Sequence, residues 1–349
     1  MRIFVTGGNG FIGSVVVRKL VERGDTVRCL VRPTSDTQRI DDLPVERVIG
    51  DVRDAASLAA GMAGCERVIH LAGLSSWNDL NSPLMDEIVV GGTQNVLDAA
   101  REAGRLRTVV VSTSVAVNGT SEPVVHDETS ALDLPPGGYV YSRAKARAEE
   151  VCREATADGL PVVIVNPGEV LGPNDVALIT ACNLVDFAKS WPVLVCTGGT
   201  SVVHVDDVAE GVIAALERGR PGERYILAGE NLTIRQLAEL TLDLLGQRKP
   251  IVSVPKRLLA WLGAIGTALY LPLPFNPAVL PYATLYWFVD NTRARTELGV
   301  SFRSARETLA QTLAWLAENG LVPARRVVRR APEPLSSLAP TPRAGSEPG

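Results

Sequence analysis

Residues 1–24 read MRIFVTGGNGFIGSVVVRKLVERG. The apolar run RIFVTG ends on the first of three glycines spaced three apart, and a helical pattern follows at once. In a chain with 31 glycines among 349 residues this spacing arises by chance about 0.25 times, so the spacing alone is a weak signal. Its position between a strand and a helix is specific, because such a loop brings backbone amides to a pyrophosphate. We therefore predict a dinucleotide-binding loop formed by Gly7, Gly10, Phe11, Ile12 and Gly13.

Alternating strands and helices continue through the first two thirds of the chain. Runs that are apolar on both sides of the pleat, typical of buried parallel strands, occur at 2–7, 26–32, 67–73, 107–114 and 161–168. Helical patterns ended by glycine lie between them, at 11–24, 54–64, 91–104 and 141–159. The order predicts an α/β protein with a doubly wound parallel sheet.

The second part of the chain predicts a smaller domain. We expect residues 1–172 to form the dinucleotide-binding domain, with 203–230 returning to its sheet. Residues 173–202 and 231–322 are then the substrate domain, which includes amphipathic helical patterns at 233–246 and 306–320. From 323 to 349 the composition changes to Arg, Pro, Ser and Ala, which is typical of a disordered tail.

The choice of cofactor is expected at the end of the second strand. There the chain reads CLVRPTSD, and Arg32 stands where an acidic residue would bind the 2′-hydroxyl of NAD. A guanidinium suits a 2′-phosphate, so we predict NADP, with NAD as the alternative if Asp36 turns toward the ribose. Asp51 in GDVRD is a candidate for the adenine amino group, and a helix N-cap is its alternative role.

A second motif, YSRAK, places Tyr141 four residues before Lys145. Six tyrosines and five lysines predict about 0.09 such pairs by chance. Residues four apart share one face of a helix, and a nearby ammonium favours the phenolate form. We predict that Lys145 lowers the pKa of Tyr141 and that Tyr141 acts as acid and base.

A reacting carbonyl also needs a second hydrogen-bond donor on its oxygen. Ser112, Thr113 and Ser114 follow the strand that begins at 107, at the edge where open parallel sheets bind ligands. Capping of the strand end is the alternative role for each hydroxyl. From these residues alone, the choice among the three stays open.

Composition limits the partners. A net charge of −4 and a pI near 5.6 give no basic surface for nucleic acid. Five cysteines without a CxxC pair indicate reduced thiols rather than a disulfide framework or a metal site. The first strand begins at Arg2, so we expect no signal peptide and a cytoplasmic location. The nearly uncharged stretch 258–275 is interpreted as an apolar wall of the substrate pocket or packed helices, with contact to a membrane surface as an alternative.

The motifs together resemble the extended short-chain dehydrogenase/reductases, over residues 1–322. They are TGGNGFIG, GDVRD, HLAG, VSTSVAVNG, YSRAK and NPGEVLGP, in this order. LVRPTSD, VHVDDVAEG and GERYILAGENLT are similar to the bacterial dihydroflavonol-4-reductase-like group, which includes hopanoid-associated sugar epimerases. The resemblance implies a Rossmann domain with a C-terminal substrate domain. It also implies Ser114, Tyr141 and Lys145 as the catalytic trio, with Asp51, Val52, Ala72, Gly73 and Pro167 against the cofactor.

Three functions are consistent with these features. The first is an NADP-dependent reductase of a ketone or aldehyde, for which the apolar stretch 258–275 favours a lipophilic substrate. The second is a nucleotide-sugar epimerase that acts through a transient ketone, for which Arg235, Arg293 and Arg295 are candidate diphosphate ligands. The third is a dinucleotide-binding protein without turnover. A homodimer is a further expectation that the resemblance raises and the sequence leaves open.

Overall fold

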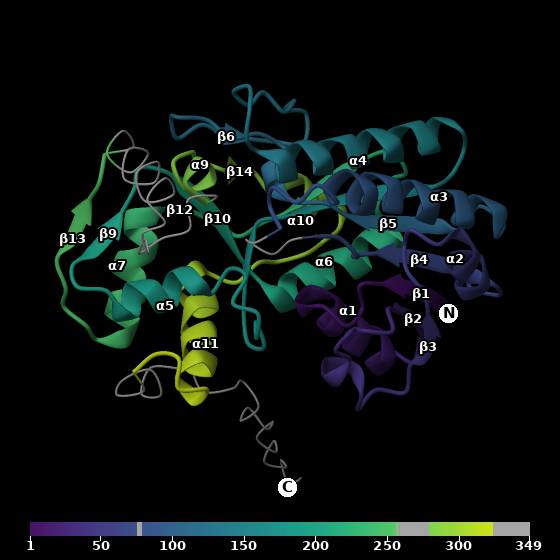
Figure 1. The fold of residues 1–349 in the computed structure, drawn as a ribbon, viewed down its shortest axis with the longest axis horizontal. Helices are drawn as coiled ribbons and strands as arrows, with labels where there is room; N and C mark the ends of the chain where they lie inside the picture. Colours follow the sequence, from purple (N-terminus) through teal and green to yellow (C-terminus); the bar gives the residue numbers. More distant parts are fainter. Residues whose placement is uncertain (75–78, 256–257, 259–278, 324–349) are drawn as a thin grey trace, which may run out of the picture.

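The computed structural model describes residues 1–74, 79–255, 258 and 279–323. Its centre is a seven-stranded parallel sheet in the order β11-β7-β5-β4-β1-β2-β3 (Figure 1). The strands are β1 Arg2–Thr6, β2 Thr26–Val31, β3 Glu46–Ile49, β4 Arg67–His70, β5 Arg107–Val111, β7 Val162–Pro167 and β11 Arg224–Leu227. The chain runs from β1 to β3 on one side and then returns to the other side of β1. The predicted doubly wound α/β fold is confirmed.

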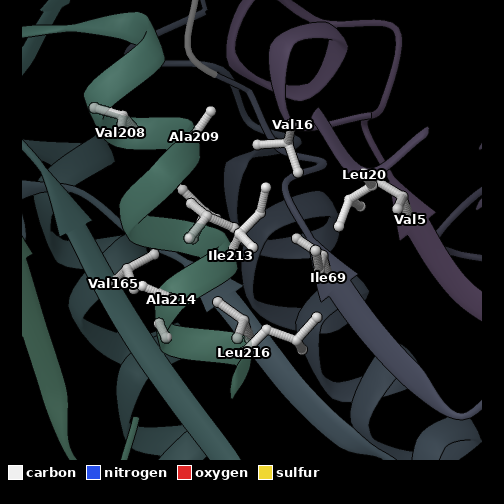
Figure 2. Packing of buried hydrophobic residues seen from close by; sticks show 14 of the residues in the cluster. Val5, Val16, Leu20, Ile69, Val165, Val208, Ala209, Ile213, Ala214 and Leu216 are labelled. Atoms are coloured by element: carbon white, nitrogen blue, oxygen red, sulfur yellow. The ribbon is translucent and has the colours of Figure 1, made fainter. Parts of the chain in front are cut away.

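Helices cover both faces of this sheet (Figure 1). On one face, α1 (Phe11–Glu22) packs against α6 (Val205–Arg218). Figure 2 shows Val16 and Leu20 of α1 and Ile213 of α6 in one apolar cluster with Val5 and Ile69 of the sheet. The opposite face carries α2 (Ala55–Met62), α3 (Gly92–Glu102) and α4 (Val140–Ala157).

The central strands contain consecutive apolar residues because both faces of the sheet are covered. In β1, Ile3 and Val5 point toward α1 and α6, whereas Phe4 between them packs with the core under α2 and α3. All three side chains are fully buried. Because both faces are covered, the strand needs apolar residues at consecutive positions, which is why its sequence shows no polar alternation.

A smaller part packs beside the carboxyl edge of the sheet (Figure 1). It contains a three-stranded sheet in the order β12-β10-β8 and the two-stranded pairs β13-β9 and β14-β6. These strands are β6 Val125–His126, β8 Glu169–Leu171, β9 Val193–Val195, β10 Gly199–His204, β12 Glu230–Thr233, β13 Ile251–Ser253 and β14 Phe288–Val289. The helices are α5 Cys182–Lys189, α7 Ile234–Leu245, α9 Leu280–Ala283, α10 Thr292–Glu297 and α11 Ala305–Glu318. Leucines of α5, α7 and α11 form its own apolar core.

Two sequence expectations fall on residues outside the described chain. These are the apolar stretch 258–275, apart from Leu258, and the tail from 324 onward. Within the described ranges, every helix is too short or too polar to cross a membrane.

Candidate active site

The glycine loop connects β1 to α1 in a conformation that requires glycine. Gly7 has φ +71°, and a Cβ on it would lie 2.7 Å from the backbone nitrogen of Ala72. A Cβ on Gly13 would lie 2.0 Å from the carbonyl oxygen of Gly7. The N-cap of α1 is Gly10, and no side chain caps the first turn. The amides of this turn are therefore open to an anion.

A cavity of about 870 Å³ extends from this loop along the carboxyl ends of the strands. It lies where the chain order reverses between β1 and β4, the point at which open α/β sheets bind ligands. The structure brings together on its wall every residue that the sequence assigned to the site. They are Gly7, Gly10, Phe11, Ile12, Gly13, Arg32, Asp51, Val52, Ala72, Gly73, Ser114, Tyr141, Lys145 and Pro167.

The two acidic alternatives at the cofactor end have other partners. Asp36 lies outside the cavity, and its carboxylate accepts from the backbone amide of Gln38 at 2.9 Å. Asp51 lines the cavity and pairs with Arg53 at 3.0 Å. The hydrogen bond from Arg53 holds the pKa of Asp51 below its usual value. The N-cap of α2 is Asp54, so the capping alternative for Asp51 is wrong.

Tyr141 differs from the expectation in one respect. Burial raises its pKa to about 12, while a hydrogen bond with Thr113 acts in the opposite direction. The prediction that Lys145 lowers this pKa is not met in the protein alone. The physical reason is the burial of the phenol, and the Lys145 ammonium donates to the carbonyl of Val111 at 3.0 Å. Tyr141 is thus a neutral phenol at pH 7, the form that can donate a proton.

Lys145 is buried against the sheet, one helical turn beyond Tyr141 on α4. Burial lowers its pKa to about 8, and the charge of Glu149 acts against this shift. A Cβ built on Gly73 would lie 3.5 Å from the Lys145 nitrogen. Gly73 therefore leaves the ammonium accessible from the cavity.

The three hydroxyls after β5 have different surroundings. Ser112 Oγ donates to the Glu149 carboxylate at 2.6 Å. Thr113 is the hydrogen-bond partner of Tyr141. Ser114 is buried, begins a short 3₁₀ turn and lines the cavity. Ser114 is thus the hydroxyl whose hydrogen-bonding capacity is available to a ligand on the cavity side.

Sequence reasoning named Thr113 only as one of three candidate hydroxyls, and it missed the residues behind Thr113. Asn166 of β7 donates to the carbonyl of Thr113 at 2.9 Å and to Glu149 at 2.7 Å. Glu149 follows Lys145 at the same spacing at which Lys145 follows Tyr141. The sequence could have indicated Glu149 by this spacing, because Tyr141, Lys145 and Glu149 share one helix face. Three polar residues on one buried helix face are unusual.

An aromatic wall closes the cavity on the side of Tyr141. Tyr282 and Trp287 stack with ring centroids 5.8 Å apart, and both line the cavity. Tyr139 packs edge-on against both rings and lies outside the cavity, with φ +52°. Leu80 joins this cluster and also faces the cavity.

The charged groups on the cavity wall are mostly acidic away from the cofactor end. Among the described lining residues, the cations are Arg32 and Lys145. Glu169 and Asp186 also line the cavity, and burial raises the pKa of both carboxyls. Asn183 donates to Glu169 at 3.2 Å.

The three arginines considered as diphosphate ligands lie outside this cavity. Arg293 pairs with Glu223 at 2.5 Å, and Arg235 donates to Ser253 at 2.9 Å. The described cavity therefore gives no support to Arg235, Arg293 and Arg295 as diphosphate ligands, because Arg235 and Arg295 are exposed and Arg293 is paired with Glu223.

Comparisons with known proteins agree with this geometry. The model of the NAD-dependent epimerase/dehydratase family matches residues 3–228. The sterol demethylase protein B of Methylococcus capsulatus is 32% identical over 332 residues, which cover 92% of this chain and 100% of that protein. The dihydroflavonol 4-reductase of Zea mays is 30% identical over 281 residues, which cover 73% of this chain and 76% of that protein.

A solved structure gives the same picture. A nucleoside-diphosphate-sugar epimerase from Pseudomonas aeruginosa superposes with a TM-score of 0.75 and 28% sequence identity. The match covers 92% of this chain and 99% of that one. The chain therefore belongs to the NAD-dependent epimerase/dehydratase family and is an NAD(P)-dependent enzyme of the extended short-chain dehydrogenase/reductase type.

Proposed function

We propose that the enzyme reduces a ketone or aldehyde of a lipophilic small molecule with NADPH. The bound nicotinamide would supply a hydride to the carbonyl carbon. Tyr141, neutral at pH 7, donates its proton to the carbonyl oxygen as negative charge develops there. Ser114 donates a second hydrogen bond to the same oxygen. Lys145 stabilises the tyrosinate that remains.

One observation carries this proposal: a single cavity holds the glycine loop, Tyr141 and an aromatic wall. The wall favours a substrate with a flat or fused apolar skeleton, because burying apolar area contributes about 25 cal/mol per Å². The names of two relatives, which refer to a sterol and to a reductase of a dihydroflavonol, support the same class of substrate.

The preference for NADP rests on Arg32. Its side chain lines the cavity immediately after β2, and Asp36 lies outside the cavity. A planar guanidinium binds a phosphate through two parallel hydrogen bonds, which a ribose hydroxyl cannot use. We therefore propose that Arg32 contacts the 2′-phosphate of NADP.

A nucleotide-sugar epimerase is the second candidate, supported by the likeness to the Pseudomonas structure. Such a substrate carries a diphosphate, which needs cations near the reacting sugar. Among the described residues that line the cavity, the cations are Arg32 and Lys145, and the proposed reduction already uses both. We place the reductase first for this electrostatic reason.

The test is a substrate panel with NADPH, followed at the nicotinamide absorbance band. The panel contains sterol-like ketones, aromatic ketones and UDP-sugars. Oxidation of NADPH by a ketone, with the alcohol identified by mass spectrometry, supports the reductase. Interconversion of UDP-sugars without net change in cofactor supports the epimerase and contradicts our first proposal.

A further inference from the structure

Glu149 is a buried carboxylate that the proposed reaction does not use directly. It lies one turn beyond Lys145 on α4 and is 1% exposed. Ser112 Oγ and Asn166 Nδ2 donate to its Oε1 at 2.6 and 2.7 Å. Arg224 Nη1 donates to Oε2 at 3.1 Å, and Arg153 approaches the same oxygen at 3.7 Å. Burying a carboxylate costs free energy of folding unless hydrogen bonds and ion pairs compensate the lost water. We therefore looked for a function of Glu149 beyond the fold.

The bonds of Glu149 lead to the residues that hold the reacting tyrosine. Ser112 is adjacent to Thr113, and Asn166 also donates to the carbonyl of Thr113 at 2.9 Å. Thr113 in turn bonds to Tyr141. One carboxylate thus ties α4 to the carboxyl ends of β5 and β7, where the hydroxyl-bearing segment begins.

Burial lowers the pKa of Lys145, and the charge of Glu149 acts in the opposite direction. The titratable groups facing the Lys145 ammonium are Glu149 and Cys152 on α4 and His70 on β4. Burial keeps His70 neutral, and burial raises the pKa of the Cys152 thiol. On the β5 side, the ammonium meets the carbonyl of Val111. Among these described groups, Glu149 is the carboxylate, and it forms an ion pair with Arg224 at 3.1 Å.

We propose that Glu149 is a positioning residue of the active site, which fixes the segment from Ser112 to Ser114 and places a carboxylate one helical turn beyond Lys145. This inference rests on the proposed reductase function for its kinetic part only. The competing explanation is a purely structural ion pair between Glu149 and Arg224, which joins α4 to β11. That ion pair alone would affect folding and leave the rate of hydride transfer in the folded enzyme unchanged.

The first experiment measures the titration of Lys145 directly. The chain has five lysines, so ¹³C labelling at lysine Cε gives a simple NMR spectrum, assigned with Lys145→Arg. Glu149→Gln keeps an acceptor oxygen for Ser112 and Asn166 but removes the charge. We expect the titration midpoint of Lys145 to fall by about half a pH unit or more. The control is Glu150→Gln, an exposed neighbour on the same helix, which should leave the midpoint unchanged.

The second experiment measures hydride transfer in single turnovers with NADPH and a ketone that the panel identifies. Glu149→Gln should slow hydride transfer about tenfold or more and move the loss of activity at alkaline pH to a lower pH. Its Kd for NADPH should change little. Glu149→Asp, which restores the charge, should return the alkaline limit toward that of the wild type.

Several results would overturn the proposal. One is a Lys145 midpoint and a hydride-transfer rate in Glu149→Gln that match those of Glu150→Gln. Should Glu149→Gln not fold, Ser112→Ala removes only one hydrogen bond, and hydride transfer as fast as in the wild type would also contradict positioning. If the wild type reduces no ketone or aldehyde, the proposed function fails, and the NMR titration still decides the electrostatic role of Glu149.

Discussion

At the scale of single residues, burial determines the protonation states of the site. It raises the pKa of Tyr141 to about 12 and lowers that of Lys145 to about 8. Both changes have the same physical cause, because the charged form of each group loses water in the cavity wall. The pair is therefore neutral phenol and largely protonated amine at pH 7, which suits proton donation to a substrate.

Replacing Tyr141 with Phe tests this role. The phenyl ring keeps the packing but removes the proton donor, so we expect hydride transfer to fall by about 10²–10⁴-fold. The Kd for NADPH should stay within a few fold, as measured by fluorescence titration. Tyr139→Phe is the matched control, because that hydroxyl lies outside the cavity and donates to the carbonyl of Pro281 at 3.3 Å. Equal activity in Tyr141→Phe and the control would exclude the mechanism.

His70 gives a prediction about pH and stability. It is buried between the hydroxyls of Thr6 and Thr93, at 2.7 and 3.2 Å, and burial lowers its pKa to about 3. The folded protein therefore resists protonation of a group that has a pKa near 6.5 when unfolded. The resulting stability is complete above about pH 6.5 and is lost as the pH falls toward about 3.

The measurement is urea unfolding at pH 7 and pH 4. A tenfold difference in proton affinity between the folded and unfolded chain corresponds to about 1.4 kcal/mol, so His70 should account for about 3 kcal/mol of the stability lost between these pH values. In His70→Asn the loss should be smaller by about that amount. The same pH dependence in both proteins would show that His70 is not responsible.

At the scale of elements, the turn from β1 into α1 depends on backbone contact. A Cβ on Gly13 would overlap the Gly7 carbonyl oxygen at 2.0 Å, so no side chain fits while helix and loop keep their positions. The close approach leaves the helix amides directed at the cavity. The same close contact between Gly13 and Gly7 therefore fixes the loop and positions the amides that would bind an anion.

Gly13→Ala should move α1 away from the loop and weaken NADPH binding about 100-fold or more, which calorimetry can measure. Gly91→Ala is the control, since a Cβ there would lie 3.8 Å from its nearest neighbour and its backbone is already helical. That variant should bind NADPH as the wild type does. Unchanged binding in Gly13→Ala would contradict the placement of the pyrophosphate at this loop.

At the scale of the whole molecule, cofactor binding should stabilise the folded chain. A ligand present at 100 times its Kd stabilises a protein by about 2.7 kcal/mol. If Arg32 contacts the 2′-phosphate, NADPH should raise Tm more than NADH does at the same concentration. In Arg32→Asp the order should reverse, as measured by differential scanning calorimetry. Equal increases in Tm with both cofactors in the wild type would remove the argument for NADP.

The sequence predicted the central sheet well for a physical reason. Strands covered on both faces need consecutive apolar residues, and the turns between them need glycine, so the pattern in β1, β2, β4, β5 and β7 is local. The loop around Gly7 and the pair Tyr141 and Lys145 are also local, because their spacing follows from one turn and one helix.

Other features depend on residues far apart in the chain. The sequence could not choose among Ser112, Thr113 and Ser114, because their directions depend on Glu149 and Asn166 from other elements. The direction of the Lys145 ammonium toward Val111 was equally hidden, and so was the burial that raises the pKa of Tyr141.

The amino-acid sequence by itself thus determined the family, the sheet and the positions of the glycine loop and the tyrosine–lysine pair. Tertiary structure alone decided what surrounds them. Trp287 and Tyr282 reach Tyr141 from about 140 positions further along the chain, and the three candidate arginines end outside the cavity. Backbone conformation depends on steric contacts between residues close in sequence, so a sequence pattern can predict it. The pKa values and the lining of the pocket depend on burial among residues far apart in the sequence.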